Sequence, residues 1–435
     1  MLTPGYQFGK AKNTFRGTLA SNTNDGNMLL GTSGWVFGGF GYKAKNSFAI
    51  TVTKVADFNQ SVAYNGQNNT SSFATPLADE FAASQLTIEE ALNSDNISLT
   101  TKMALYTYLV DTAAGQVIAR SENTTMLNQQ YLTETNGGIT EITLGMGHEL
   151  NKKLLLGASL GIPIVKLDRS SYYRESDATA DLNEFDFMAF RENYSLRGVG
   201  LNLRAGLIYR PQEYLRFGFA IHSPDAMMLK EKYDAGLATD VENLFAASYD
   251  SVASSEFTNG SRIETRYTNY TPMKFILSGS YVFREIEDVT KQKGFITADI
   301  EYVNYKWMKF GSYDEETSFS KEYYKPFNEA IDAFYKGAFN FRLGGELKFN
   351  TIMARLGFAY YGNPYKDNSA LKASRMNLSG GLGYRHKGVF VDLTYVHRMN
   401  KNVNFPYRVS APRPNTFANL KETNGNVLLT VGFKI

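Results

Sequence analysis

Apolar and polar residues alternate one by one along many segments of about ten residues in this chain. From Phe339 to Phe349 the odd-numbered residues are phenylalanine, leucine or glycine, while the even-numbered residues include Arg342, Glu346 and Lys348. The end of the chain, from Val427 to Ile435, alternates in the same way. Successive side chains of a β-strand point to opposite faces, so the pattern predicts strands with one apolar and one polar face.

Fourteen such segments can be found, and the connections between them alternate in length. The predicted strands are 3–15, 27–42, 47–63, 139–150, 153–166, 194–210, 214–230, 262–283, 294–310, 338–349, 351–362, 375–386, 388–399 and 424–435. Short connections are expected at 43–46, 151–152, 211–213, 284–293, 350 and 387, and long ones at 64–138, 167–193, 231–261, 311–337, 363–374 and 400–423, with a shorter one near 16–26. Short turns on one side and long loops on the other are typical of a transmembrane β-barrel. We therefore expect an all-β chain that forms one antiparallel barrel domain over residues 1–435.

The composition agrees with strands that meet two different environments. Aromatic residues make up 14% of the chain, yet its mean hydropathy is negative at −0.31. Only alternate residues of a transmembrane strand meet lipid, while aromatic residues gather at both membrane interfaces. No apolar run reaches the roughly 18 residues that a spanning helix needs, so a membrane span in this chain requires a closed sheet.

Charge and reactive side chains exclude several other functions. The net charge is only +2, no basic stretch alternates with aromatic residues, and nucleic acid is therefore not an expected partner. Cysteine is absent, which excludes disulfides and cysteine-bound metals. The histidines His148, His222, His386 and His397 lie on different predicted strands and lack the spacing of metal ligands. We expect neither a metal, nor a cofactor, nor enzymatic activity.

Several charged residues share the polar faces of three neighbouring predicted strands. They are Asp299, Glu301, Arg342, Glu346, Lys348 and Arg355. A basic residue on the lipid face at mid-depth costs about 2–4 kcal/mol, so these side chains are expected to point into the barrel lumen. There they serve either to hold a polar plug or to hydrate a wide bore, as in porins.

The longest predicted loop, 64–138, carries helix signals. Thr75 followed by Pro76 reads as a helix cap with proline in the first turn, and Asp79 and Glu80 follow. Two more helices are predicted over 100–113 and 327–335. One reading is that apolar residues in these segments bind a hydrophobic ligand at the extracellular mouth of the barrel. The candidates are Leu77, Phe81, Met103 and Tyr106. The alternative is that the helices only cap and stiffen the mouth.

Six segments together resemble the outer-membrane transporter family for long-chain fatty acids and aromatic hydrocarbons, especially its branch in Bacteroidetes. The segments are Phe58–Ser72, Ala220–Tyr233, Thr271–Phe283, Gly294–Phe310, Leu356–Asp367 and Leu378–Arg398. The resemblance implies a fourteen-stranded barrel in the outer membrane of a Gram-negative bacterium. It also implies passive uptake of hydrophobic molecules, which extracellular loops capture and which leave sideways through the barrel wall. Outer-membrane lipid and lipopolysaccharide are then neighbours of a monomeric protein.

In that family the sideways exit accompanies a kink in the third strand. The third predicted strand of this chain contains Asp57, Phe58 and Asn59. Asp57 and Asn59 are poor strand formers on the same face, so one reading of this segment is a local break. The alternative is an ordinary strand whose polar face looks into the lumen.

The family pattern and this chain differ at the N-terminus. Family members begin with an export signal and a plug that fills the lumen, whereas residues 2–5 of this chain already belong to the first predicted strand. We expect the signal to precede residue 1, and the plug either precedes it too or is absent. An absent plug would favour a general diffusion porin for small polar solutes. A surface protein that binds partners through its loops is a further alternative.

Overall fold

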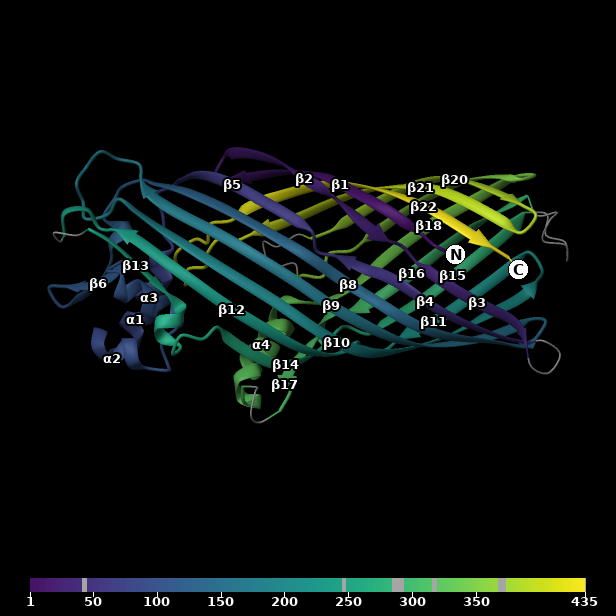
Figure 1. The fold of residues 1–435 in the computed structure, drawn as a ribbon, viewed down its shortest axis with the longest axis horizontal. Coiled ribbons are helices and arrows are strands. Elements are labelled where there is room, and N and C mark those ends of the chain that lie inside the picture. The colour runs from purple at the N-terminus through teal and green to yellow at the C-terminus, as the bar shows by residue number, and fades with distance from the viewer. Residues whose placement is uncertain (41–44, 245–247, 284–292, 315–318, 367–372, 435) are drawn as a thin grey trace.

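A large antiparallel sheet dominates the structure, a computed structural model that describes residues 1–40, 45–244, 248–283, 293–314, 319–366 and 373–434. Its strands run obliquely along the length of the molecule, on both the near and the far side (Figure 1). Both chain termini lie toward one end, and α1 (Ala74–Ser84), α2 (Ile88–Asn93) and α3 (Leu99–Tyr106) lie at the other. The prediction of an all-β chain is confirmed.

Most ladders of the sheet join strands that are next or nearly next to each other in chain order, and the first strand pairs with the last, from Gly5 opposite Leu428 to Phe15 opposite Ala418. The strands are β1 (Pro4–Phe15), β2 (Thr18–Leu30), β3 (Ser33–Phe40), β4 (Asn46–Asp57), β5 (Gln60–Asn68), β8 (Leu127–Asn151), β9 (Leu154–Asp177), β10 (Phe187–Gln212), β11 (Leu215–His222), β12 (Ala226–Asp240), β13 (Tyr249–Ala253), β14 (Ile263–Tyr270), β15 (Lys274–Phe283), β16 (Gly294–Asn304), β17 (Lys309–Ser312), β18 (Gly337–Phe349), β19 (Ile352–Tyr361), β20 (Arg375–His386), β21 (Val389–Asn404) and β22 (Ala418–Phe433). Each of the fourteen predicted segments overlaps one of these strands or two successive ones.

Several strands are longer than the alternation predicted. β2 begins at Thr18, inside the connection predicted near 16–26, and β12 continues to Asp240 instead of ending at 230. β8 begins at Leu127 instead of residue 139, β9 continues to Asp177 instead of ending at 166, and β10 begins at Phe187 instead of 194. In these extensions polar residues such as Gln129 and Thr133 are buried, so the apolar-polar alternation that marks a lipid-facing strand is missing. The loop predicted over 64–138 is therefore wrong at both ends. Residues 43–44 of the predicted turn 43–46 and residues 284–292 of the predicted turn 284–293 lie outside the described residues.

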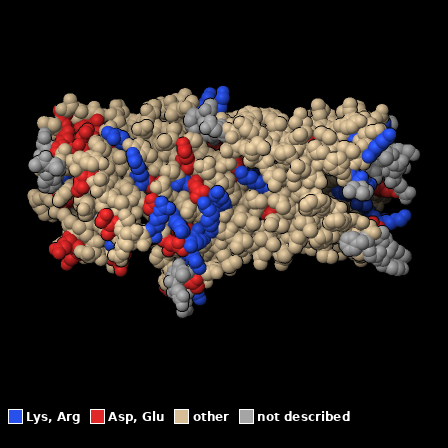
Figure 2. All heavy atoms as spheres, viewed as in Figure 1, with Lys and Arg blue, Asp and Glu red and all other residues tan. Residues whose placement is uncertain are grey.

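The two faces of the sheet are the reverse of those of a soluble protein. On neighbouring strands, Leu356, Leu382 and Leu393 are 77%, 63% and 52% exposed. On the opposite face, Asn340 and Glu346 are 2% and 7% exposed. Figure 2 shows a broad zone without charged side chains between the charged part that carries the helices and the end that carries the termini. An exposed apolar zone of this extent is the outer surface expected of strands that meet lipid.

The loop helices agree only partly with the sequence. The predicted cap at Thr75 is wrong, because α1 begins at Ala74 with Phe73 as its N-cap, and its first turn holds no acidic residue. α3 ends at Tyr106 instead of continuing to 113, because the chain then turns into the hairpin of β6 (Val110–Ala113) and β7 (Gln116–Ala119).

The helix predicted over 327–335 is present as α4 (Lys321–Phe334), which begins earlier because the Ser320 hydroxyl accepts a hydrogen bond from the Tyr323 backbone N–H. Pro326 lies inside this helix, in its second turn. Within the described part of the chain, none of the helices combines the length and the apolar character needed to cross a lipid bilayer.

Candidate functional site

The third span of the sheet is interrupted at Phe58 and Asn59, between β4 and β5. On the neighbouring strand β8, the pairing with β4 ends at Gly138, opposite Asp57, and the pairing with β5 resumes at Thr135, opposite Gln60. The three residues proposed from sequence as a lateral opening therefore lie at a real break in the strand ladder.

Side chains hold the break in place. The Asn59 amide nitrogen donates to Asp57 Oδ1 at 2.8 Å, and Lys54 forms an ion pair with the same carboxylate. The Gly137 N–H donates to Asn59 Oδ1 at 2.9 Å, and the Phe58 N–H donates to the Gly137 carbonyl at 3.2 Å. The polar residues that interrupt the strand thus replace the ladder bonds that are missing there.

Beyond the break, β5 lies beside β2 but forms no backbone ladder with it. Among the ladders of the described residues, β2 pairs only with β1, and β5 pairs only with β8. β5 is also tied to β1 and the turn after it, where the Asn13 amide donates to the Ala63 carbonyl at 2.8 Å and Arg16 Nε donates to the Gln67 carbonyl at 3.0 Å. Among the described residues, the backbone ladder between the second and third spans is therefore confined to β3 and β4, from Ser33 opposite Val52 toward the terminal end of the sheet.

An apolar patch lies on the inner face of the sheet, next to the break. Its buried members are Val165, Met227, Leu229, Tyr267 and Tyr324, and the half-buried Phe58, Ile139, Leu196 and Phe310 pack against them. The patch needs two glycines beneath it. A Cβ on Gly198 would lie 2.4 Å from Leu229 Cδ2, and one on Gly200 would lie 2.4 Å from Met227 Sδ. Sequence reasoning missed this patch, because its members come from strands far apart in the chain.

A cavity of about 1010 Å³ adjoins β8, β9 and β10, which also contribute to the patch, and lies toward the end that carries the β8–β9 turn. β4, β8, β9, β10, β11 and β15 contribute to its wall. Much of the wall consists of glycine and serine, including Gly145, Gly157, Gly206, Gly218 and Ser278. Arg204, Arg216 and His222 also line the cavity, so its wall combines small side chains with larger polar ones.

The predicted lumen charges do share the buried face, and most are joined in ion pairs. Arg342 pairs with Glu301 at 2.8 Å, and Arg355 pairs with Glu346 at 2.6 Å. Lys348 lies 3.9 Å from the Glu346 carboxylate.

Asp299 lies opposite Arg342 in the strand register. The sequence reasoning missed Asp392, which binds Arg355 Nη1 at 2.6 Å, although Asp392 interrupts an apolar strand in the same way as the others. The result is a polar wall whose charges largely balance one another.

Comparisons with known proteins agree with this architecture. No protein-family model matches the sequence, and no curated relative matches it. Among solved structures, the Pseudomonas putida toluene transporter TodX superposes with a TM-score of 0.52 at 11% identity, over 100% of this chain and 89% of TodX. This chain has the fold of TodX. A Pseudomonas aeruginosa homologue of FadL gives a TM-score of 0.51 at 12% identity, over 100% of this chain and 90% of that protein.

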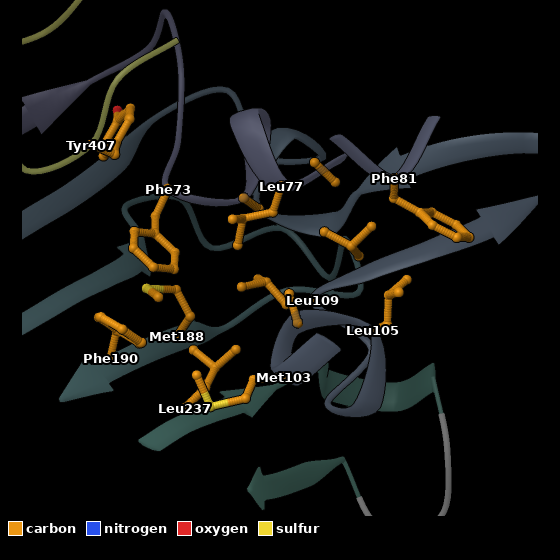
Figure 3. Packing of buried hydrophobic residues seen from close by; sticks show 14 of the residues in the cluster. Phe73, Leu77, Phe81, Met103, Leu105, Leu109, Met188, Phe190, Leu237 and Tyr407 are labelled. Atoms are coloured by element: carbon orange, nitrogen blue, oxygen red, sulfur yellow. The ribbon is translucent and has the colours of Figure 1, made fainter. Parts of the chain in front are cut away.

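In this TodX-like fold, the predicted ligand residues of the mouth are mostly inaccessible. Leu77, Phe81 and Met103 are 8%, 2% and 0% exposed in a cluster that joins α1 and α3 to the extended ends of β8, β9, β10 and β12 (Figure 3). Only Tyr106 is exposed, and its ring meets that of Phe257 edge-on. This packing agrees with the alternative reading, in which the helices cap and stiffen one end of the sheet.

A buried carboxylate lies within this cap, beyond the apolar zone of the sheet. Glu175 Oε1 accepts hydrogen bonds from the Tyr173 hydroxyl at 2.6 Å, the Gln129 amide at 2.7 Å and the Phe73 N–H at 2.9 Å. Burial raises the pKa of Glu175 to about 7, because desolvation outweighs these three bonds. The cap of this TodX-like fold therefore contains a group that changes charge near neutral pH.

Proposed function

We propose that this chain is an outer-membrane channel that takes up small hydrophobic molecules, such as long-chain fatty acids or aromatic hydrocarbons, without an energy source. In this proposal the large sheet is a closed barrel of fourteen spans, and the molecules leave sideways between β2 and β5. The printed descriptions of the structural neighbours, a toluene transporter and a FadL homologue, support the same class of substrate.

The observation that carries the proposal is the position of the apolar patch directly beside the break. Phe58 belongs to both features, since it interrupts the third span and packs against the patch. A hydrophobic molecule on the patch thus lies next to the only stretch of the second and third spans that no described backbone ladder joins.

Elementary energetics favour a sideways exit. Each methylene group buried from water gains about 0.8 kcal/mol, so release of a fatty chain from the patch into water would be strongly uphill. Release into the hydrocarbon of the bilayer keeps the same groups out of water, so its free-energy change is close to zero. The polar wall of β16, β18, β19 and β21 offers no comparable surface, because Glu301, Glu346 and Arg355 occupy it in ion pairs.

The test is uptake by the purified protein in lipid vesicles, measured with a fluorescent long-chain fatty acid and with toluene. The double variant Asp57→Val/Asn59→Val removes the side chains that hold the break and supplies strand-forming residues. We expect it to lower the uptake rate at least tenfold while the protein still inserts. The control is Asn65→Val, an exposed position on β5, which should leave uptake unchanged.

Planar-bilayer recordings separate this proposal from the porin alternative. A channel for hydrophobic molecules should show little steady ion conductance, whereas a general diffusion porin would show large, stable conductance steps. Large steps combined with fatty-acid uptake that does not respond to Asp57→Val/Asn59→Val would overturn the proposal.

A further inference from the structure

Three lysines form a row across the outer face of neighbouring strands. Lys401 on β21 lies opposite Lys421 on β22, and Lys421 lies opposite Lys12 on β1. All three are exposed, as is Lys10, two residues before Lys12 on the same face. Neighbouring strands are about 4.8 Å apart, so three long, flexible side chains of one sign start within about 10 Å of one another.

Nothing in the described structure balances this row. Among the described residues, none of the three lysines makes an ion pair, and Glu422, the acidic neighbour of Lys421 in the chain, points to the opposite face, toward the Gln60 amide. Like charges directly opposite each other destabilise a strand pair. The row therefore costs folding free energy unless an anion from outside the chain binds to it.

The position of the row indicates what kind of anion this is. Below it, toward the chain termini, the same faces of β1 and β21 carry Phe8 and Tyr395, whose rings are stacked at 6.5 Å, and then Tyr6. Further along β21, Leu393 belongs to the exposed apolar zone. An aromatic girdle marks the edge of the hydrocarbon, and lysines just beyond it reach the level of the lipid headgroups.

A second basic row provides the contrast. Lys166, Arg197, Lys230 and Arg266 lie opposite one another across β9, β10, β12 and β14. There Asp168 binds Arg197 through both carboxylate oxygens at 2.6 and 2.8 Å, and Glu264 pairs with Lys230. Figure 2 shows acidic side chains among the basic ones over this part of the sheet. This row is balanced by the chain itself, whereas the lysine row on β21, β22 and β1 is not.

We propose that Lys12, Lys401 and Lys421 form a binding site for the phosphate of an outer-leaflet lipid, of the lipid A class. A phosphate monoester carries nearly two negative charges and three acceptor oxygens, which suits convergent ammonium groups. The site rests on the proposed membrane orientation but does not depend on transport. Bound lipid would hold β21, β22 and β1 at a fixed depth, on the strands next to the β2 edge of the break.

The experiment measures thermal unfolding of the full chain in zwitterionic detergent, with and without added lipid A. Lipid A should raise the unfolding temperature, and Lys12→Ala/Lys421→Ala should weaken its binding about 25-fold, since each lysine near an anionic surface contributes about fivefold. Without lipid, this variant should unfold at a temperature equal to or above that of the parent, because like-charge repulsion is removed. Lys12→Arg/Lys421→Arg should keep the binding.

Controls separate the lipid from other anions and from non-specific charge. Lys152→Ala/Lys153→Ala removes two exposed lysines from the turn between β8 and β9, and it should bind lipid A as the parent does. Dephosphorylated lipid A and inorganic phosphate should both fail to raise the unfolding temperature. Equal binding by Lys12→Ala/Lys421→Ala and the parent would overturn the proposal, as would an equal response to inorganic phosphate. Fatty-acid uptake by the same variants reports separately on the proposed transport.

Discussion

The backbone N–H of Gly137 donates a hydrogen bond to the side chain of Asn59 across 2.9 Å, at the point where the ladder between β8 and the third span stops. A side chain thus takes over the role of a backbone carbonyl for one residue. Gly137 has a φ of +123°, a conformation that L-residues with a side chain rarely adopt. The break depends on this glycine as much as on the polar residues that face it.

The first prediction concerns Gly137→Ala. The added Cβ would lie 2.0 Å from the Lys166 carbonyl oxygen, and the backbone conformation would be strained. We expect a loss of about 1–3 kcal/mol in the free energy of unfolding, measured by denaturant titration in detergent. The matched control is Gly279→Ala, where a Cβ would meet no atom within 4 Å, and which should change stability by less than about 0.5 kcal/mol. Equal effects of the two changes would show that the local backbone at the break is not constrained.

The second prediction concerns the apolar patch and uses two adjacent methionines that face opposite ways. Met227 is 4% exposed inside the sheet, and Met228 is 46% exposed on the outer face. Met227→Gln places an amide where a bound fatty chain would leave it without a partner, at a cost of about 1–3 kcal/mol. We expect fatty-acid binding to weaken about tenfold or more, measured by fluorescence titration. Met228→Gln should bind as the parent does, and a similar loss in both variants would place the ligand elsewhere.

Much of the sheet could be predicted because its information is local. Alternation from Phe339 to Phe349 depends only on which face meets lipid, and Asp57 and Asn59 interrupt that pattern within three residues. The missing ladder between β2 and β5 could not be predicted, since it depends on contacts such as Asn13 with Ala63 that join distant parts of the chain. The apolar patch could not be predicted for the same reason, because its residues come from distant parts of the chain.

The burial of the cap residues could not be predicted from the sequence either. Leu77, Phe81 and Met103 are equally apolar whether they line an open ligand site or pack against β10 and β12. Only the tertiary packing, with Met188 and Leu237 fully buried beside them, distinguishes the two cases. The predicted helix start at Thr75 was wrong because the Ser72 N–H donates to the Thr75 hydroxyl. This bond places Thr75 inside the first turn instead of at the cap.

The third prediction concerns pH and Glu175 in the cap. Its pKa in the folded protein is about 7 against an ordinary value of 4.5, so the folded state holds this proton more tightly than the unfolded state does. Stability is therefore complete below pH 4.5, falls as the pH rises from 4.5 to about 7, and is then lower by about 3 kcal/mol. Hydrogen exchange of residues 69–81, corrected for the intrinsic effect of pH, should become faster over this range.

Glu175→Gln is the matching variant. Its amide oxygen can accept the three hydrogen bonds now made to Oε1, and its NH2 group would occupy the position of Oε2, which has no hydrogen-bond partner in the described structure. The variant should lose most of the pH dependence and should be more stable than the parent at pH 8. The tyrosines beside it, Tyr173 and Tyr407, have pKa values raised by burial and stay neutral throughout. A slope that survives in the variant would assign the effect to another group.

The fourth prediction tests which face of the sheet meets lipid, again with two adjacent residues. Leu393 is 52% exposed and lies opposite Leu382 and Leu429, whereas Thr394 faces inward, opposite Gly381. A lysine on the lipid face near mid-depth costs about 2–4 kcal/mol, while a lysine in a polar interior costs little. We expect Leu393→Lys to fold into vesicles poorly, judged by the heat-dependent shift of the folded band on gels, and Thr394→Lys to fold nearly as well as the parent. If Thr394→Lys were the more damaging change, the exposed apolar zone would not be a lipid-facing surface, and both the channel and the lysine row would lose their physical basis.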